Sequence, residues 1–210
     1  MTVAARPVSL RAQAYENFRQ QIVTARIRPG QFISQRELMQ LLGMPLGAVR
    51  ELIPRLEAEG LLQTVPQRGL QIAHVDLKLI HNAYHLRRLL EVEAALRFAA
   101  TVTPGDLALV EDAHRRIVER ACHGPVDAAL LADASAVDSG FHELMIDALG
   151  NELIAEIYRV NSLRIRLIKL EGAVMSGDVL QSTMQEHLRV VEAIRRRDPV
   201  AVRSSIEAHV

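Results

Sequence analysis

From Val75 to the end of the chain, turn sequences separate six segments that each have the apolar periodicity of a helix. The separators are "TPG", "HGP", "GN", "SG" and "RDP", which are typical of helix ends and helix starts. The six segments cover residues 77–101, 105–122, 126–149, 152–173, 177–197 and 199–210, and none alternates as a strand does. Six helices with short connections predict an antiparallel helical bundle.

The first third of the chain has a different pattern. An amphipathic segment from Ala12 to Thr24 is followed by Ser34 and Glu37, which have capping-box spacing ahead of a second helix. A third helix, "AVRELIPRLEAEG", follows a tight connection, and "LLQTVPQRGLQIAHV" then alternates around a Gln67–Arg68–Gly69 turn. Three helices followed by a two-stranded hairpin predict a winged helix-turn-helix.

These patterns divide the chain into three parts and give a mainly α fold class. We expect a flexible arm over residues 1–11, a winged helix-turn-helix over residues 12–75 and an all-helical domain over residues 76–210. Hydrophobic residues make up 49% and charged residues 24% of the 210 positions, so the chain can bury a sizeable core.

Charge is distributed unevenly along the chain although the net charge is zero. Residues 1–76 contain nine arginines and six acidic residues, whereas residues 77–210 contain 16 basic and 19 acidic residues. A local basic excess favours contact with nucleic acid in the first part. Seven of the eight histidines lie after residue 80, so any imidazole chemistry belongs to the second part.

The sequence predicts a cytoplasmic protein that does not enter a membrane. The N-terminal stretch "MTVAARPVSLRAQ" lacks the apolar region of a signal peptide. Apolar runs stay well below the roughly 20 residues that a membrane span requires. A single cysteine, Cys122, excludes an internal disulfide and is typical of a reducing compartment.

Three arginines are candidates for DNA contact. A winged helix-turn-helix places its third helix in the major groove, where Arg50 lies opposite the apolar side of that helix. Arg36 lies at the start of the second helix, whose positive end favours phosphate, and Arg68 lies at the wing tip. Each arginine alone is more typical of a solvated surface, but the set on this fold indicates phosphate or guanine contacts.

Asp138 and His142 lie four residues apart in "DSGFHELMIDALGN", which directs both side chains to one helix face. His187 and His209 lie on two later predicted helices. Helical bundles build metal sites from facing helices, and imidazoles with a carboxylate suit Zn, Ni, Mn or Fe better than Ca or Mg. A lone histidine is more often a surface or hydrogen-bonded core residue, which is our interpretation of His81, His85, His114 and His123.

Residues 12–73 resemble the DNA-binding domain of the GntR family of bacterial transcription regulators. The shared framework in "IRPGQFISQRELMQLLGMPLGAVRELIPRLEAEGLLQTVPQRGLQI" is PG, S-x-R-E-L, L-G, V-R-E, R-L-x-x-x-G-L and a wing with R-G. The resemblance implies that Arg36 and Arg50 contact the operator and that Gly69 approaches the DNA.

Two positions depart from that family pattern. Leu46 stands where the family usually has an arginine that helps to read the operator. Pro54 lies inside the third helix, where a proline removes a backbone donor at a cost of about 3 kcal/mol and predicts a kink. The operator sequence is therefore expected to differ from the family's usual one.

Residues 77–209 resemble the all-helical effector domain, called FCD, of the FadR subfamily of these regulators. The resemblance is carried by "HLRRLLEVEAALRFAA", "DSGFHELMIDALGN", "EHLRVVEAIRRRDPVAV" and "EAHV". Metal-binding members have D-x-x-x-H on one helix and one histidine on each of two later helices, which correspond here to Asp138, His142, His187 and His209. Arg87 matches an arginine that often pairs with an anionic ligand, although it could instead pair with Glu91 one turn away.

Together these features predict a homodimeric DNA-binding transcription regulator that reads a palindromic operator. We expect one divalent transition metal per chain, zinc first and then nickel, manganese or iron. A small organic or sugar acid would fill an open position on the metal, with Arg87 as its second anchor. The alternatives are a metal-dependent enzyme and a regulator with a purely structural zinc. The complete DNA-binding domain favours a regulator over an enzyme.

Overall fold

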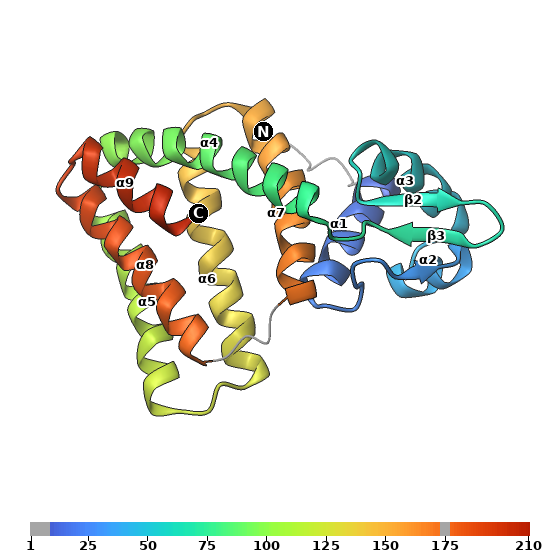
Figure 1. The fold of residues 1–210 in the computed structure, drawn as a ribbon, viewed down its shortest axis with the longest axis horizontal. Helices are drawn as coiled ribbons and strands as arrows, with labels where there is room; N and C mark the ends of the chain where they lie inside the picture. The colour runs from blue at the N-terminus through green and yellow to red at the C-terminus, as the bar shows by residue number, and fades with distance from the viewer. Residues whose placement is uncertain (1–8, 173–176) are drawn as a thin grey trace, which may run out of the picture. The chain divides into compact units, whose positions relative to one another are not determined.

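The computed structural model describes residues 9–172 and 177–210, which form two compact units (Figure 1). The first unit contains the described residues up to Ala83 together with those from 160 to 172. The second unit contains Tyr84–Arg159 and residues 177–210. Two long helices, α4 (Leu77–Thr101) and α7 (Glu152–Gly172), therefore contribute residues to both units.

The first unit has the order of elements expected of a winged helix-turn-helix. Its elements are α1 (Leu10–Val23), β1 (Phe32–Ile33), α2 (Gln35–Leu42), α3 (Leu46–Ala58), β2 (Leu62–Val65) and β3 (Gly69–Ile72). The described strands form an antiparallel sheet in the order β1-β3-β2, in which Leu62 pairs with Ile72 and Phe32 with Gln71. The hairpin was predicted, whereas β1 was missed because two residues are too short to alternate visibly.

Capping residues set the helix boundaries of the first unit. Ser9 accepts a hydrogen bond from the Ala12 amide, so α1 begins at Leu10, two residues before the predicted start. Residues 1–8 of the predicted arm lie outside the described part of the chain. The predicted capping box is confirmed, since Ser34 and Glu37 each bond the other's backbone amide. Helix α3 continues through Pro54 as one helix.

Helix α7 completes the hydrophobic core of the first unit. Leu163 and Leu167 are buried in the same cluster as the fully buried Phe18, Leu38 and Leu52 of α1, α2 and α3. On the same helix, Arg164 donates to the Glu59 carbonyl at 2.6 Å, and Arg166 donates to the Val23 carbonyl at 2.8 Å. These arginines satisfy carbonyl oxygens at the C-terminal ends of α3 and α1, which a helix itself leaves unpaired.

The second unit is helical throughout its described residues. Besides the parts of α4 and α7, it contains α5 (Pro104–His123), α6 (Ala128–Asp147), α8 (Gly177–Arg195) and α9 (Pro199–His209). All of these boundaries lie within two residues of the predicted ones, and the mainly α fold class is confirmed. Thr103, Asp127 and Asp198 cap the N-termini of α5, α6 and α9 through their side-chain oxygens.

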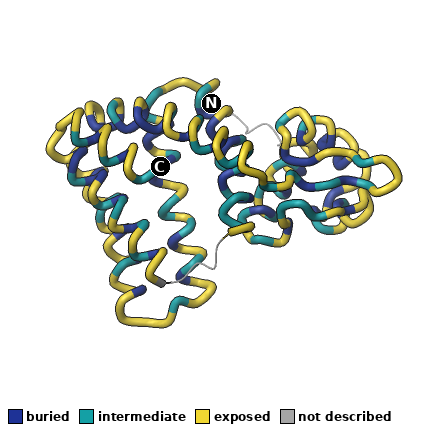
Figure 2. Tube along the Cα trace, in the orientation of Figure 1, coloured by how far each residue is buried: buried dark blue, intermediate teal, exposed yellow. Residues whose placement is uncertain are grey.

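Helix packing brings segments that are distant in sequence next to one another. Helix α8 packs against α5 and α9, and α5 also packs against α6. Figure 2 shows buried and exposed residues alternating along these helices, as expected when each covers one side of a shared core. None of the helices in the described residues combines the length and apolar character needed to cross a membrane.

Candidate metal centre

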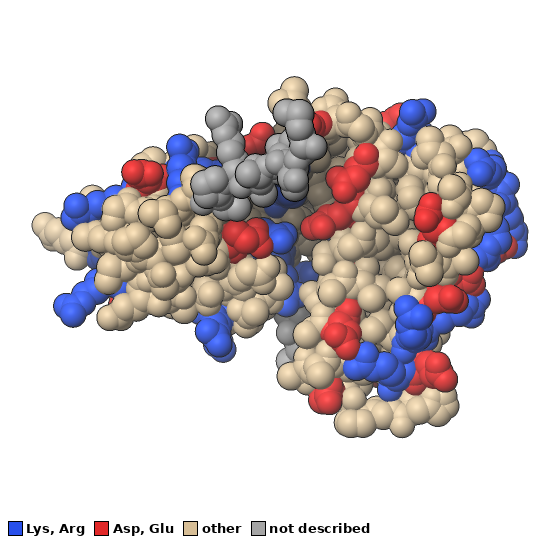
Figure 3. Space-filling model, turned by 180° about the vertical axis from the view of Figure 1, so that it is seen from behind, with Lys and Arg blue, Asp and Glu red and all other residues tan. Residues whose placement is uncertain are grey.

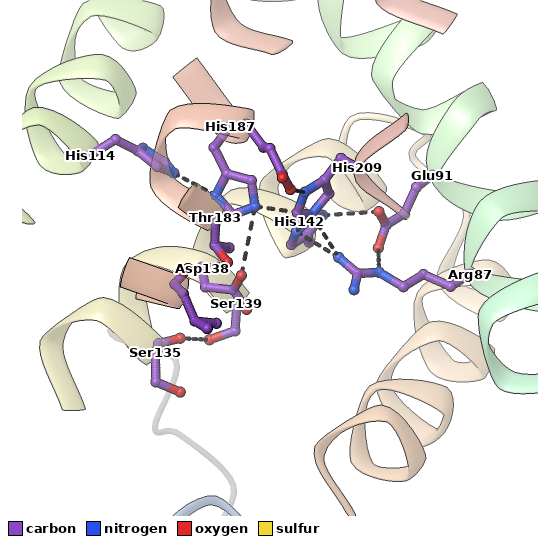
Figure 4. A network of polar contacts seen from close by, with 12 residues as sticks. Arg87, Glu91, His114, Ser135, Asp138, Ser139, His142, Thr183, His187 and His209 are labelled. Atoms are coloured by element: carbon purple, nitrogen blue, oxygen red, sulfur yellow. Dashed lines mark hydrogen bonds and ion pairs between the residues drawn. The ribbon is translucent and has the colours of Figure 1, made fainter. Parts of the chain in front are cut away.

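Three histidines from three helices of the second unit direct their Nε2 atoms at one point (Figure 4). His142 on α6 and His209 on α9 have their Nε2 atoms 3.3 Å apart, and His187 on α8 has its Nε2 3.1 Å from that of His209. One ligand atom from each of the three lies within 4.8 Å of the others. His142 and His187 are buried, so the cluster lies inside the helical unit.

Carboxylates face the outer ring nitrogens of two of these histidines. Glu186 Oε2 accepts from His209 Nδ1 at 3.0 Å. Glu91 Oε2 lies 3.0 Å from His142 Nδ1, close enough for an ion pair although not aligned as a hydrogen bond. An acceptor at Nδ1 keeps the proton on that nitrogen, which leaves the Nε2 lone pair directed at the centre of the cluster.

His114 on α5 provides the acceptor for the outer ring nitrogen of His187. His114 Nδ1 lies 2.7 Å from the Val110 carbonyl oxygen, which can only accept, so Nδ1 carries the proton. His114 Nε2 is then the acceptor for His187 Nδ1, 3.0 Å away. His187 Nε2 is thereby left as a lone pair. His114 is a buried, hydrogen-bonded histidine as expected, but the sequence did not indicate that its partner belongs to this cluster.

Asp138 borders the cluster on the side of His187. Its Oδ1 lies 3.6 Å from His187 Nε2, and its side chain is 21% exposed. It lies one helical turn before His142 on α6, as the four-residue spacing predicted. The three histidines meet the distance requirement for a metal site without it, so its role as a fourth ligand stays a prediction.

Arg87 on α4 reaches both Glu91 and the histidines. Its Nε donates to Glu91 Oε1 at 2.7 Å, which is the ion pair that their four-residue spacing allows. Its Nη2 also lies 2.7 Å from His142 Nε2 and 3.4 Å from His209 Nε2. One guanidinium thus has donors for the carboxylate and for the cluster, and its pairing with an anionic ligand stays a prediction.

Glu91 accepts a further hydrogen bond and stays ionised. Tyr158 on α7 donates its hydroxyl proton to Glu91 Oε1 at 2.8 Å. Burial alone would raise the pKa of Glu91, but the nearby His142 and Arg87 outweigh it and lower the pKa to about 2. Glu91 and Tyr158 were not among the predicted site residues, and only the spacing of Glu91 from Arg87 hinted at either.

Burial keeps two of the clustered imidazoles neutral. It lowers the pKa of His187 well below the usual histidine range. Burial also lowers the pKa of His209 to about 4, assisted by His142 and Arg87. Neutral imidazole is the form that binds a metal, so these residues are prepared for coordination at neutral pH.

The predicted DNA-contacting arginines lie on the surface of the first unit. Arg36 on α2 and Arg50 on α3 are exposed. Arg68 lies in the turn between β2 and β3, with its guanidinium 4.0 Å from the centre of the Phe32 ring. Figure 3 shows basic side chains predominating on this unit, whereas basic and acidic groups are mixed over the helical unit.

Gly69 has a structural requirement of its own. Its φ of +93° lies in the region that favours glycine, and a Cβ there would come 3.1 Å from the Ile33 carbonyl oxygen. The close pairing of β1 with β3 therefore already explains a glycine at this position. Its approach to DNA stays a prediction.

Comparison with known families decides the class of protein. The model of the bacterial regulatory proteins of the gntR family matches residues 10–72, and the FCD domain model matches residues 82–210. The chain belongs to the GntR family of bacterial transcription regulators and carries an FCD domain. It is accordingly a DNA-binding transcription regulator.

Individual GntR-type relatives support the same assignment over nearly the full length. The HTH-type transcriptional repressor RspR of Escherichia coli K12 is 25% identical, covering 94% of this chain and 84% of that protein. The Nta operon transcriptional regulator of Aminobacter aminovorans is 23% identical, covering 90% and 85% respectively. Among solved structures, E. coli McbR/YncC has a similar fold, with a TM-score of 0.77 at 19% identity over 96% of this chain and 93% of that one.

Proposed function

We propose that this regulator holds one divalent transition metal per chain at the His142, His187 and His209 cluster, and that a carboxylate metabolite bound there controls operator affinity. The observation that carries this proposal is the convergence of three Nε2 atoms whose opposite ring nitrogens each face an acceptor. A buried core histidine also pairs its N–H group, but three Nε2 lone pairs that face one another repel unless a cation lies between them, which is the arrangement that a metal requires.

The donor set fits a first-row transition metal. Three neutral imidazoles with Asp138 as a fourth ligand suit zinc first, and nickel, manganese or iron as alternatives. The bound ion would supply a concentrated positive charge with positions open to an anionic ligand. Glu91, Glu186 and His114 would hold the imidazole rings in register for it.

The charge of Arg87 favours an anionic effector. Its guanidinium lies within hydrogen-bond distance of His142 Nε2, so a metal bound there would place two cations close together. A carboxylate between them would relieve that repulsion and bind both, which neither a neutral nor a cationic metabolite could do. We therefore expect a small organic or sugar acid as the effector.

Helix α7 is a candidate to transmit the state of the site. Its residue Tyr158 bonds Glu91 in the second unit, while Arg164 bonds the carbonyl of Glu59 after α3 in the first unit. The segment "QIAHVDLK", which leads from the wing into α4, is the route that the sequence itself suggested. A ligand acts on DNA only through a difference in affinity between two states of such elements.

On the DNA, we infer that a homodimer binds a palindromic operator. Symmetric dimers of helix-turn-helix proteins read two half-sites, with the third helix in the major groove. Arg50 would contact base edges, whereas Arg36 and Arg68 would contact phosphates. Arg50→Ala should therefore cost about 1–3 kcal/mol at the operator, and Arg36→Ala should weaken binding to all sequences more uniformly.

Metal analysis of the purified protein tests the site. Wild type should contain one metal per chain, and His187→Ala should lose most of it because one of three converging donors is gone. His123→Ala is the matched control, since His123 is exposed and its Nδ1 lies 2.9 Å from the Glu119 carbonyl oxygen of its own helix. Equal metal content in wild type and His187→Ala would remove these residues from the site.

The same preparations separate the alternatives. A purely structural zinc would bind without responding to any carboxylate, because closed coordination leaves no position for a ligand. A metal-dependent enzyme would turn over a substrate in the absence of DNA. A regulator of the proposed kind would bind the acid and release it without changing it chemically.

A further inference from the structure

The exposed face of α3 is poor in hydrogen-bonding side chains at its N-terminal end. Val49, Leu52 and Leu56 are buried in the core of the first unit. The exposed positions before the last turn are Leu46, Gly47, Arg50, Glu51 and Pro54. Two apolar residues therefore precede the arginine on the face that a helix-turn-helix turns toward DNA.

Leu46 is not needed by the fold at this position. Its side chain is 38% exposed, and it belongs neither to the buried cluster of the first unit nor to the partly buried residues packed on it. It is the first residue of α3, where the N-terminal residues of a recognition helix reach base edges. Beside it, a Cβ added to Gly47 would meet nothing within 4 Å among the described residues, so this end of α3 is open to a partner.

A leucine can recognise only one feature of the major groove. The base edges there present hydrogen-bond donors and acceptors, which an alkyl side chain cannot satisfy, and the C5-methyl group of thymine. Burying that methyl group against Leu46 is favourable, whereas placing Leu46 over the polar edge of cytosine leaves that edge without a partner.

We propose that Leu46 is a specificity-determining residue that contacts the C5-methyl group of a thymine in each operator half-site. Arg50 lies one turn further along the same face, about 6 Å along the axis of α3. Since base pairs are stacked about 3.4 Å apart, the thymine lies within about two base pairs of the guanine that Arg50 contacts. This inference rests on the binding of α3 in the major groove.

The test replaces single methyl groups in the DNA. The preferred operator is first selected from random DNA with the full-length protein, and each thymine of a half-site is then replaced by deoxyuridine. Wild type should bind about fourfold more weakly at one of these positions, the change expected for leaving one methyl group exposed to water. The thymines outside the half-sites serve as the control within the same DNA.

Protein variants assign the effect to Leu46. In Leu46→Ala the preference for thymine over deoxyuridine at that position should disappear, whereas Leu46→Met should retain it because its side chain is apolar and of similar volume. Arg50→Ala should bind more weakly overall but retain the preference. A substitution that only disturbed the helix would weaken binding to the original operator and to its deoxyuridine-substituted form equally.

Three results would overturn the proposal. They are a wild type that binds every deoxyuridine-substituted operator as well as the original, a Leu46→Ala variant that keeps the preference, and a selected half-site that contains no thymine near its guanine. A selection that yields no preferred sequence would overturn the major-groove binding on which the proposal rests, and that failure is distinguishable because it precedes the substitutions.

Discussion

His114 reaches the candidate metal centre only through another histidine. Its Nε2 accepts from His187 Nδ1, and its own Nδ1 is held by the Val110 carbonyl. This chain of two hydrogen bonds fixes which nitrogen of His187 carries a proton and how its ring is turned. If a metal binds there, His114 would orient a ligand without being one itself.

Replacing His114 should weaken metal binding without removing a ligand. We expect His114→Phe to lower the metal affinity by about 10–100-fold, because His187 Nδ1 loses its acceptor. Competition with a chelator of known affinity measures this change. The control is His123→Phe, an exposed histidine whose substitution should leave the affinity unchanged. An unchanged affinity in His114→Phe would show that the pair only fills the core.

The pH dependence of metal retention follows from the lowered histidine pKa values. An ordinary histidine would lose the metal as pH falls through about 6.5, because protons compete for the same nitrogen. Burial lowers the pKa of His209 to about 4 and that of His187 well below its usual range, so the folded chain takes up these protons only at lower pH. We expect full metal content after dialysis at pH 6 and loss as the pH approaches 4. Half-loss near pH 6.5 would contradict this.

The thermal stability of the metal-free protein should begin to fall at a higher pH than the pH at which the site loses its metal. The unfolded chain binds protons at His187 and His209 near pH 6.5, whereas the folded chain does so near or below pH 4. A depressed folded pKa gives stability that is present above pH 6.5 and is lost as the pH falls toward 4. The melting temperature of metal-free protein should therefore decline from pH 6.5 downward.

Sequence alone could predict the candidate ligands better than the groups that hold them. The four-residue spacing of Asp138 and His142 is visible in one helix, and the resemblance to the FCD domain supplied His187 and His209. Helix packing brings Glu91 of α4 against His142 and His114 of α5 against His187. No spacing along the chain encodes such a meeting, because it depends on how separate helices are oriented.

Among the elements, α7 is the one whose role differs most from its appearance in the sequence. Its periodicity predicted a bundle helix over residues 152–173, and the helix is found there. An apolar stripe does not say what it packs against, however, and Leu163 and Leu167 complete the core of the DNA-binding unit. Strand β1 was missed for a different reason, since a two-residue strand leaves no alternation to detect.

The packing of α7 predicts a stability change in that unit. Leu167 is fully buried, so Leu167→Ala should lower the free energy of unfolding by about 2–5 kcal/mol. Leu153 on the same helix is 72% exposed, and Leu153→Ala should change the free energy of unfolding by no more than about 0.5 kcal/mol. Chemical denaturation of the two variants beside wild type measures the difference. Equal effects would mean that this half of α7 is not part of the core.

The hydroxyl of Tyr158 tests α7 as a route between site and DNA. Tyr158→Phe keeps the ring but removes the hydrogen bond to Glu91. Metal content and operator affinity without effector should stay as in wild type, while the effect of the acid on operator affinity should decrease. Titrations with and without effector would reveal this. An undiminished response would assign transmission to another element, with the segment before α4 as the first candidate.

At the scale of the whole molecule, the chain joins a DNA-binding unit to a helical unit with a candidate metal site. Its net charge of zero is the sum of a basic first part and an acidic second part, and the basic excess lies in the unit that binds DNA. Helices α4 and α7 belong to both units, so a change in the helical unit has two continuous segments through which to act. An effector that binds one state of the chain better by a few kcal/mol would suffice to change the operator affinity.

The most direct test is a titration of operator binding with organic and sugar acids, using wild type, Arg87→Ala and His187→Ala that have all been incubated with the same metal. At least one acid should change the operator affinity of wild type by about 5–150-fold, the usual range for coupling between two sites. Both variants should bind the operator without acid as wild type does and show no response to it. Arg87→Ala should also keep its metal, because a guanidinium has no lone pair to offer a metal and its removal leaves the three histidines in place. Variants that respond as fully as wild type would contradict control of the DNA through this site.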